Sequence, residues 1–515
     1  MGLPLLKRAT EDGHTFVLTP RRSAGSAPVA APVAPAARVP LRAPEPGEQY
    51  RFHVDMRKCI GCKCCVVACN EQNGNPASIN WRRVGEIEGG WYPQTQRAYL
   101  SMGCNQCLEP TCMSGCPVDA YTKDSATGIV LHSADACIGC QYCTWNCSYG
   151  VPQYNPERGV VGKCDMCHGR LGLGQAPACV SACPTGAIQV EIVKIDDWRA
   201  ATMVQNPAAG LPSLDQSLST TRITLPERLA PNARPVDLVR LSPAEPHWPL
   251  VVMTVLTQLS VGTFTTIWLL QLLGASTRLG AAALTSLVAS VLALAGSTLH
   301  LGRPIYAYRA LKAWKRSWLS REVLLFAAFS VVACLYAGLL WLQWPGSFAI
   351  GAVTVLFGLG GVTASAHIYR VPSRPAWNTP LTLVQFHLTA ATLGPLLAAA
   401  VGTGDPRWLA VAGATMAGAV LVVLAVRFLR LSAADVVELR ASATLLATTL
   451  MPRLLLRGVL LAFGAIALPL FTVHPIALWG AFTLALGAEL LGRYLFFVSA
   501  VPKNMAAPYL GSEAA

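Results

Sequence analysis

The chain has 515 residues, which is too long for one compact domain. Hydrophobic residues make up 53% of it, charged residues only 13%, and the formal net charge is +13. An ordinary soluble domain is roughly 25% charged. All but one of the 18 cysteines lie between Cys59 and Cys183, and nearly all long apolar runs follow Trp248. This distribution excludes a single soluble domain and predicts a cysteine-dense soluble module followed by a membrane module.

Residues 1–50 are predicted to form an N-terminal arm and tether. The segment 23–47 is rich in alanine and proline, which is typical of an extended linker. Arg21 and Arg22 precede it, but the residues that follow are interrupted by prolines and lack the apolar stretch of a twin-arginine signal. We therefore expect no export signal, and either a disordered arm or an arm that lies along a partner subunit.

Sixteen of the cysteines fall into four groups of four. Groups one and three share the spacing C-x2-C-x2-C-x3-C, and groups two and four end in cysteine followed by proline. Aligning group one on group three makes Cys65 a ligand and leaves Cys64 over, for which we expect the role of a small buried thiol. The groups are Cys59, Cys62, Cys65, Cys69; Cys104, Cys107, Cys112, Cys116; Cys137, Cys140, Cys143, Cys147; and Cys164, Cys167, Cys179, Cys183.

The spacing of these groups favours [4Fe–4S] clusters. Three close cysteines on one turning loop reach three irons of a cube, and the fourth thiolate comes from elsewhere in the chain. Small residues such as Gly61 and Gly139 allow the loop backbone to approach the cube and to donate N–H groups to its sulfurs. Zinc is the competing ligand, but its four-cysteine sites use two close pairs. Disulfides do not require such triplets either.

The stretch CIGCQYCTWNCSYGVPQYN (137–155) resembles the third group in the four-cluster iron–sulfur subunit of dimethyl-sulfoxide-reductase-type molybdopterin oxidoreductases. The resemblance covers about residues 50–195 and implies an α+β ferredoxin-like domain over 51–195. Ser148 replaces the family's usual proline and leaves the ligands intact, and because every ligand position is cysteine, four [4Fe–4S] clusters are implied. The implied ligand sets are Cys59, Cys62, Cys65, Cys183; Cys164, Cys167, Cys179, Cys69; Cys104, Cys107, Cys112, Cys147; and Cys137, Cys140, Cys143, Cys116.

Apolar runs of about 20 residues predict membrane-spanning helices. Eight such runs predict an all-α eight-helix transmembrane bundle over 248–500, preceded by a linker over 196–247 and followed by a tail over 501–515. A large soluble helical core is the alternative, but the runs lack a polar face. The expected helices cover roughly 248–273, 279–300, 322–344, 347–368, 380–401, 407–429, 454–473 and 475–499.

The loop charges predict the orientation of this bundle. With a cytoplasmic N-terminus, fifteen arginines and lysines fall in cytoplasmic segments, and only Arg278 and Arg407 fall on the opposite side. The net charge is therefore mainly a topology signal and not a nucleic-acid patch. We expect a multi-pass protein of a bacterial cytoplasmic membrane, with the iron–sulfur domain and both termini in the cytoplasm.

Ionisable groups at membrane depth are candidates for function. The motifs HLGRP (300–304) and SWLSRE (317–322) resemble the membrane anchor of dimethyl sulfoxide reductases over about residues 248–500. This resemblance implies that His300 binds a quinone, either ubiquinone or menaquinone. An imidazole can donate a hydrogen bond to a quinone oxygen and exchange its proton near neutral pH.

Four further residues are candidates for the quinone site. Arg303, Arg321 and Glu322 are candidate neighbours of His300 from their proximity in sequence, although each also fits an interfacial charge. His387 fits either a quinone pocket or a helix-packing hydrogen bond. The histidines at similar depth could instead ligate a haem, but the anchor family has none and we expect none. Glu489 is expected to pair with Arg493 one turn on, and we expect no proton pumping.

The two resemblances together imply a fusion of an electron-transfer subunit with a quinone-reactive membrane anchor. A separate catalytic subunit with a molybdopterin cofactor would carry out the substrate chemistry, so the chain itself is no catalyst toward the substrate. A cytoplasmic iron–sulfur domain implies a cytoplasmic catalytic subunit, and among the relatives the cytoplasm-facing sulfite dehydrogenases fit this better than the exported sulfoxide reductases. The resemblance therefore favours sulfite oxidation to sulfate, with electrons passed to quinone. Quinol-driven reduction of a sulfoxide, an N-oxide or a sulfur compound is the alternative. A membrane energy converter coupled to a ferredoxin-like module is a third hypothesis.

Overall fold

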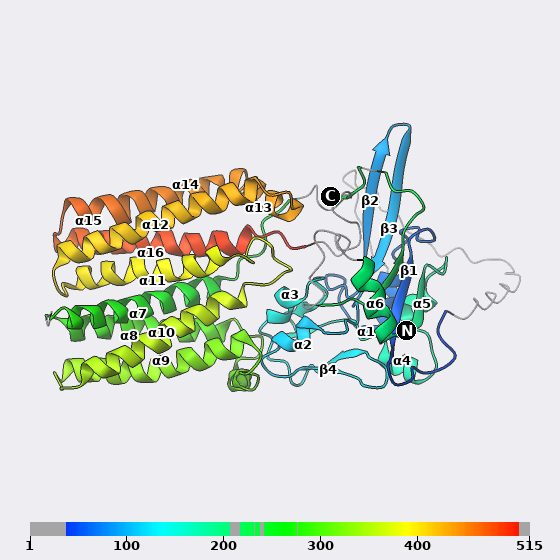
Figure 1. Cartoon of the computed structure of the whole chain (residues 1–515), viewed down its shortest axis with the longest axis horizontal. Coiled ribbons are helices and arrows are strands. Elements are labelled where there is room, and N and C mark those ends of the chain that lie inside the picture. Colours follow the sequence, from blue (N-terminus) through cyan, green and yellow to red (C-terminus); the bar gives the residue numbers. More distant parts are fainter. Residues whose placement is uncertain (1–37, 206–216, 231, 237–240, 275–276, 504–515) are drawn as a thin grey trace, which may run out of the picture. The chain divides into compact units, whose positions relative to one another are not determined.

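The computed structural model describes residues 38–205, 217–230, 232–236, 241–274 and 277–503. From Arg38 onward the chain forms one compact unit. Most of the expected arm (1–37) and most of the expected tail (504–515) lie outside the described residues. The expected fold class is confirmed, because a part with short strands and helices is followed by a helical part that spans a membrane (Figure 1).

The central strand of the first part is β1 (Glu48–Asp55), whose alternating Tyr50, Phe52 and Val54 are buried. It pairs antiparallel with β8 (Ile188–Lys194) and parallel with β9 (Arg222–Thr224). A long hairpin of β2 (Arg83–Trp91) and β3 (Gln94–Met102) pairs with β10 (Arg234–Pro235). The segment 196–247, expected as a linker, thus adds one strand to each of two sheets.

The cysteine groups lie on short elements around this framework. Two small hairpins are formed by β4 (Tyr121–Lys123) with β5 (Val130–His132), and by β6 (Gln153–Asn155) with β7 (Val160–Gly162). Short helices begin inside or beside each group and hold it in place. They are α1 (Cys64–Asn73), α2 (Thr111–Gly115), α3 (Tyr142–Asn146), α4 (His168–Gly172) and α5 (Ala178–Ser181), with α6 (Ile195–Gln205) after them.

Within the described residues eight helices are long and apolar enough to span a membrane, as predicted. The third begins at Trp318, four residues before the predicted start, and the predicted ends are otherwise within about three residues. The spans are α7 (Trp248–Leu272), α8 (Leu279–Leu299), α9 (Trp318–Trp341), α10 (Ser347–Ile368), α11 (Pro380–Val401), α12 (Pro406–Ser432), Met451–Phe471 and α16 (Pro475–Val498).

The seventh span is not a uniform α-helix. A π-helical turn, η3 (Leu460–Ala467), separates α14 (Met451–Val459) from α15 (Leu468–Phe471). Two further elements were not predicted, the 3₁₀ segment η2 (Pro304–Leu311) after α8 and the helix α13 (Val437–Ala447) after α12.

Small residues allow the spanning helices to pack closely. A Cβ at Gly262 of α7 would lie 2.0 Å from the carbonyl oxygen of Ala390 on α11, and a Cβ at Gly394 would lie 2.3 Å from Gly262. Close backbone contact through small residues is typical of helix pairs in membranes. At the helix starts, Thr379 and Asp405 accept hydrogen bonds from the backbone N–H of Leu381 and Arg407, respectively.

Candidate cluster and quinone sites

Groups one and three adopt the same loop conformation. Gly61 and Gly139 have φ of +70° and +71°, and Lys63 and Gln141 both have φ of +60°. The left-handed conformation is accessible to glycine without strain, and here it turns the backbone around the space between the cysteines. The shared spacing in the sequence therefore corresponds to a shared three-dimensional loop.

Two of the expected ligand sets line cavities. A cavity of about 340 Å³ is lined by Cys104, Cys107, Cys112 and Cys147 among other residues. Another, of about 290 Å³, is lined by Cys59, Cys62, Cys65 and Cys183 among others. Within the described residues no three histidine, cysteine or carboxylate side chains gather tightly enough for a single metal ion, and none of the 18 cysteines forms a disulfide. The donor sets fit a group larger than one ion.

The other two sets are brought together across the sequence. Cys69 of group one lies within electrostatic range of Cys167 and Cys179 of group four. Cys116 of group two lies within range of Cys137 and Cys140 of group three. The fold therefore joins the outer groups to each other and the inner groups to each other, as the family resemblance implies.

Backbone N–H groups point at several cysteine sulfurs. The N–H of Gly139 donates to Cys137 Sγ over 3.4 Å, and the N–H of Met166 donates to Cys164 Sγ over 3.4 Å. Such bonds stabilise thiolates and tune the reduction potential of a bound cluster. Burial, together with the neighbouring cysteines, acts in the opposite direction and raises the pKa of both the Cys107 and Cys140 thiols to about 12. The positive irons of a cluster would favour the thiolate form at these positions.

Two buried cations lie among the cysteines. Arg82 is 1% exposed, donates from Nη1 to Ser101 Oγ over 3.1 Å, and lies within electrostatic range of Cys65, Cys164 and Cys179. Lys163 is also buried, donates from Nζ to the carbonyl oxygen of Cys164 over 3.0 Å, and lies near cysteines of the second and fourth groups. Sequence reasoning missed both, because no local pattern marks a surface-type side chain that folding buries.

The expected burial of Cys64 is wrong. Cys64 is exposed, whereas its neighbour Cys65 is buried and lines the cavity of the first set. Cys64 occupies the place that Tyr142 has in group three, directly after the left-handed residue at the start of the short helix. Cys64 is not among the residues that line the cavity, although its thiol interacts with the neighbouring Cys62.

The segment after α8 binds the loop of group three through its backbone. The N–H of Gly302 donates to the Gly139 carbonyl over 3.4 Å, and the N–H of Arg303 donates to the Ile138 carbonyl over 3.1 Å. A Cβ at Gly302 would lie 2.2 Å from the Gly159 carbonyl oxygen, so only glycine permits this approach. The HLGRP motif therefore connects the anchor to the Cys137–Cys140 loop.

The same set is held from a second side. The N–H of Ala313 donates to the carbonyl of Pro117, next to Cys116, over 3.1 Å, and Ser317 Oγ donates to the Gly115 carbonyl over 2.7 Å. The segment 300–317 thus contacts both groups that contribute to the set Cys116, Cys137, Cys140 and Cys143. Among the four implied sets, this one lies against the anchor.

His300 lies at the start of this segment, directly after the last residue of α8. Burial lowers the pKa of its imidazole to about 4, so the ring is neutral near pH 7. Its Nδ1 atom is buried and has no hydrogen-bond partner among the described residues. This neutral ring lies two residues before the contact with Gly139, where it can hydrogen-bond a polar group of a ligand.

The other residues that were expected near the quinone lie in different surroundings. Arg303 lies in the contact with group three and donates from Nη1 to the Ala134 carbonyl over 2.9 Å. Glu322, in the first turns of α9, is 3% exposed and within electrostatic range of Tyr142. Arg321 is half-buried and donates to the carbonyls of Trp314 and Lys315.

His387 makes contacts within the helix bundle. Its Nδ1 lies 2.9 Å from the Leu383 carbonyl oxygen, and its Nε2 lies 3.2 Å from Thr363 Oγ1 on α10. These contacts match the helix-packing alternative. Sequence reasoning missed Tyr142, which is 4% exposed and lies within electrostatic range of both Cys140 and Glu322.

Comparisons with known proteins agree with this division of the chain. Residues 95–193 match the family model of the 4Fe-4S dicluster domain, and residues 243–498 match that of the DMSO reductase anchor subunit. One chain of the anaerobic dimethyl sulfoxide reductase of Haemophilus influenzae is 38% identical over 177 residues, which cover 85% of that protein and 33% of the present sequence. The protein belongs to the DMSO reductase family.

Two further relatives are similar over slightly shorter stretches. A chain of the anaerobic dimethyl sulfoxide reductase of Escherichia coli K12 is 39% identical over 159 residues, 76% of that protein and 29% of this one. A subunit of the sulfite dehydrogenase of Allochromatium vinosum is 34% identical over 160 residues, 67% of that protein and 27% of this one. Because a separate region matches the anchor subunit, the protein is a fusion of an iron–sulfur subunit with an integral membrane anchor.

Proposed function

We propose that this chain transfers electrons between a molybdopterin-containing catalytic subunit and a membrane quinone, through four [4Fe–4S] clusters held by the sixteen grouped cysteines. The pairing of groups across the fold supports the four ligand sets. Bound clusters would supply one-electron carriers. The chain's own residues hold them, exclude water from them and surround them with N–H donors.

The quinone is proposed to bind beside His300. The observation that carries this proposal is the backbone contact between Gly302 and Gly139, which holds the segment of His300 against the Cys137–Cys140 loop. His300 Nδ1 would hydrogen-bond a quinone oxygen, and the neutral ring would pass protons at that atom. Arg303 lies at this contact, and Glu322 lies within electrostatic range of Tyr142 in group three. Both are proposed to complete the pocket, whereas Arg321 is proposed to be an interfacial charge.

For the substrate we propose sulfite oxidation to sulfate on the cytoplasmic side. The charge asymmetry predicted from the sequence, which is still twelve to two without the buried Arg427, Arg457 and Arg493, supports this direction. The relative named as part of a sulfite dehydrogenase supports it as well. Quinol-driven reduction of a sulfoxide is the second candidate, because the relatives named as parts of dimethyl sulfoxide reductases have the higher identity. Assays of the purified complex with sulfite and quinone, and with quinol and dimethyl sulfoxide, distinguish the two.

The orientation has its own test. Reporter domains fused after Gly274 and after Leu431 should lie on opposite sides of the membrane, with the second one cytoplasmic. Reporters on the same side would contradict the helix count or the orientation.

The quinone site is tested by His300→Ala. Quinone-linked turnover should fall roughly a hundredfold, the lower range for loss of a positioned acid–base group. Cluster content and turnover with a soluble artificial acceptor should remain, because His300 is no cluster ligand. A matched control is His474→Ala, which replaces an exposed histidine at the start of α16. Equal loss of both activities in His300→Ala, or little loss of either, would contradict the proposal.

A further inference from the structure

A second polar site lies inside the anchor, away from the segment of His300. Three arginines and one glutamate lie together on α12, α14 and α16, and each is 9% exposed or less. Guanidinium groups remain protonated in proteins. The described residues of this cluster therefore carry two more positive than negative charges in an apolar surrounding, which is costly without a counter-charge. The four residues are Arg427, Arg457, Arg493 and Glu489.

Two of the arginines are held by neutral partners. Arg427 donates from Nη1 to Gln385 Oε1 over 2.9 Å and from Nη2 to the Ala376 carbonyl over 3.2 Å. Arg493 donates from Nη2 to Gln258 Oε1 over 2.8 Å and lies 3.6 Å from the centre of the Phe386 ring. These contacts orient the two guanidiniums but are made with uncharged groups, and the carboxylate within electrostatic range of Arg493 is Glu489 of the same cluster.

Arg457 is different. The expected pairing of Glu489 with Arg493 is replaced by an ion pair of 3.6 Å between Arg457 Nη2 and Glu489 Oε1. This distance is too long for a hydrogen bond, and Glu489 Oε2 accepts from Thr389 Oγ1 over 2.6 Å. Among the described residues, neither Nε nor Nη2 of Arg457 has a hydrogen-bond partner, although both atoms are buried. Two strong donors at membrane depth are therefore available to a ligand.

The backbone provides space for this guanidinium. It lies against Gly492 of α16, where a Cβ would come within 2.4 Å of Arg457 Cζ. Arg457 is followed by the π-helical turn η3, and such turns in helices are frequent at functional sites. The position of the Arg457 guanidinium therefore depends on Gly492 of the neighbouring helix α16.

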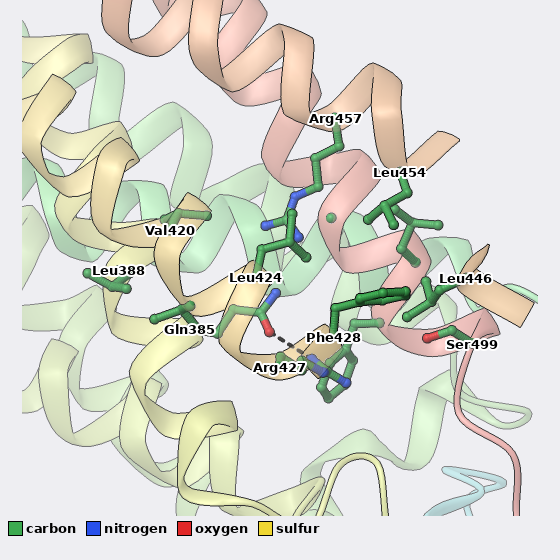
Figure 2. A pocket seen from close by; sticks show the side chains of 14 residues that line it. Gln385, Leu388, Val420, Leu424, Arg427, Phe428, Leu446, Leu454, Arg457 and Ser499 are labelled. Atoms are coloured by element: carbon green, nitrogen blue, oxygen red, sulfur yellow. Dashed lines mark hydrogen bonds between the residues drawn. The ribbon is translucent and has the colours of Figure 1, made fainter. Parts of the chain in front are cut away.

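Arg457 and Arg427 line a partly open cavity between α11, α12, α14 and α16, in which about 550 Å³ of space, open solvent included, is free of protein atoms. Figure 2 shows Arg457 reaching in from one side, with Gln385 and Arg427 joined by their hydrogen bond below it. The rest of the lining is mostly apolar, and it includes Leu388, Val420, Leu424, Phe428, Leu446 and Leu454.

We propose that this cavity binds an anionic phospholipid, with a phosphodiester oxygen accepting hydrogen bonds from Arg457 Nε and Nη2. The phosphate would offset part of the excess positive charge, and the acyl chains would lie along the leucine and valine side chains of the lining. Basic pockets between membrane helices are suited to such head groups. A quinone is neutral and would leave the charge unchanged, and inorganic phosphate has no apolar part for the lining.

The test uses the purified full-length protein in nanodiscs that contain phosphatidylglycerol and phosphatidylethanolamine, followed by native mass spectrometry. We expect one phosphatidylglycerol to remain bound per chain after mild release. In Arg457→Gln this retention should fall roughly tenfold, because a charge-assisted hydrogen bond is lost. The matched control is Arg453→Gln, which removes an exposed arginine one turn earlier on the same helix and should keep the lipid.

A second variant covers the case in which Arg457→Gln does not fold. Gly492→Ala keeps every charge but displaces the guanidinium, and should also lose the lipid. Iron content and His300-dependent turnover should remain in both variants, so failure of this proposal is distinguishable from failure of the quinone proposal.

Several outcomes would overturn the assignment. Equal retention of phosphatidylglycerol by the wild type and both variants would remove the role of Arg457. Equal retention of phosphatidylethanolamine would remove the role of charge. Displacement of the lipid by inorganic phosphate would identify a free anion site, and stoichiometric quinone that is lost with Arg457→Gln would identify a second quinone pocket.

Discussion

The cysteine loops of group one and group three have the same spacing and the same left-handed turns, but different surroundings. Ile60 and Ile138 hold equivalent places in the two loops, and they are 60% and 1% exposed. The residues after the second turn differ in the same way, since Cys64 is exposed and Tyr142 is buried. The local motif thus determines how a loop holds a cluster, whereas the elements packed on the loop determine what the cluster can exchange electrons with.

The anchor accounts for this difference. The segment 300–317 covers group three through the backbone contacts of Gly302 and Arg303 and the side chain of Ser317. No described segment covers Ile60 to the same degree, and Cys62 beside it is also exposed. We infer that group one is the end open to a partner and group three the end committed to the membrane.

The largest effect is expected from the ligands themselves. Cys65→Ser should remove one cluster, about four irons per chain, and abolish transfer between the two ends, because Cys65 is a buried thiol in the first cavity. Cys64→Ser should keep every cluster, because Cys64 is not among the residues that line the first cavity. Iron and labile-sulfide analysis of both variants checks the pair. Cluster loss in Cys64→Ser would reverse the assignment.

The second-largest effect is expected where the anchor segment 300–317 covers the group-three loop. Gly302→Ala places a methyl group against the Gly159 carbonyl and should separate the anchor segment from the group-three loop. We expect quinone-linked turnover to fall roughly a hundredfold, as misplacement by about 1 Å can cause, with artificial-acceptor turnover retained. Gly338→Ala on α9 is the control, since a Cβ there meets nothing within 4 Å. Unchanged quinone turnover in Gly302→Ala would show that the close approach is not required.

A smaller effect is expected at the open end. Ile60→Asp should weaken binding of the catalytic subunit about tenfold or more, because a charge replaces an exposed apolar contact. The chain itself should keep its clusters. Ile138→Asp, at the equivalent buried place, should instead prevent stable assembly, because it buries an unpaired carboxylate. Titration of the catalytic subunit against each variant measures the loss of binding and the loss of assembly. The same result for the two variants would argue against an open end at group one and a covered end at group three.

The smallest expected effect is a change in the reduction potential of a cluster near Arg82. Arg82 places a buried positive charge among cysteines of the first and fourth groups. At an effective dielectric constant of about 20 and a separation of about 8 Å, its interaction with an added electron is on the order of 2 kcal/mol, or roughly 90 mV. Arg82→Gln should therefore lower the potential of a neighbouring cluster by up to this amount. Redox titration checks the shift, and an upward shift would contradict it.

The sequence allowed the membrane helices and the cysteine groups to be predicted because both are local signals. A run of apolar residues must be helical in lipid, and the third span was misplaced only because SWLSRE adds a polar first turn from Trp318. The cysteine spacing likewise identified loops that the structure repeats at Gly61 and Gly139.

What the sequence did not reveal depends on contacts between distant segments. The strand β9 was taken as linker because three residues carry no pattern, and its place is determined only by pairing with β1. Arg82 and Arg457 look like ordinary surface charges in the sequence, and only packing makes them buried. Glu489 was paired with the nearest arginine on its own helix, whereas the fold brings a different helix closer.

The most direct test of this account is the iron content of the full-length protein, purified without oxygen. Four complete sets of four cysteines predict about sixteen irons and about sixteen labile sulfides per chain, with every cluster of the four-iron type. A value near twelve irons, or a three-iron signal in the undamaged protein, would contradict the four [4Fe–4S] clusters. It would also contradict the continuous electron path proposed between the loops of group one and group three.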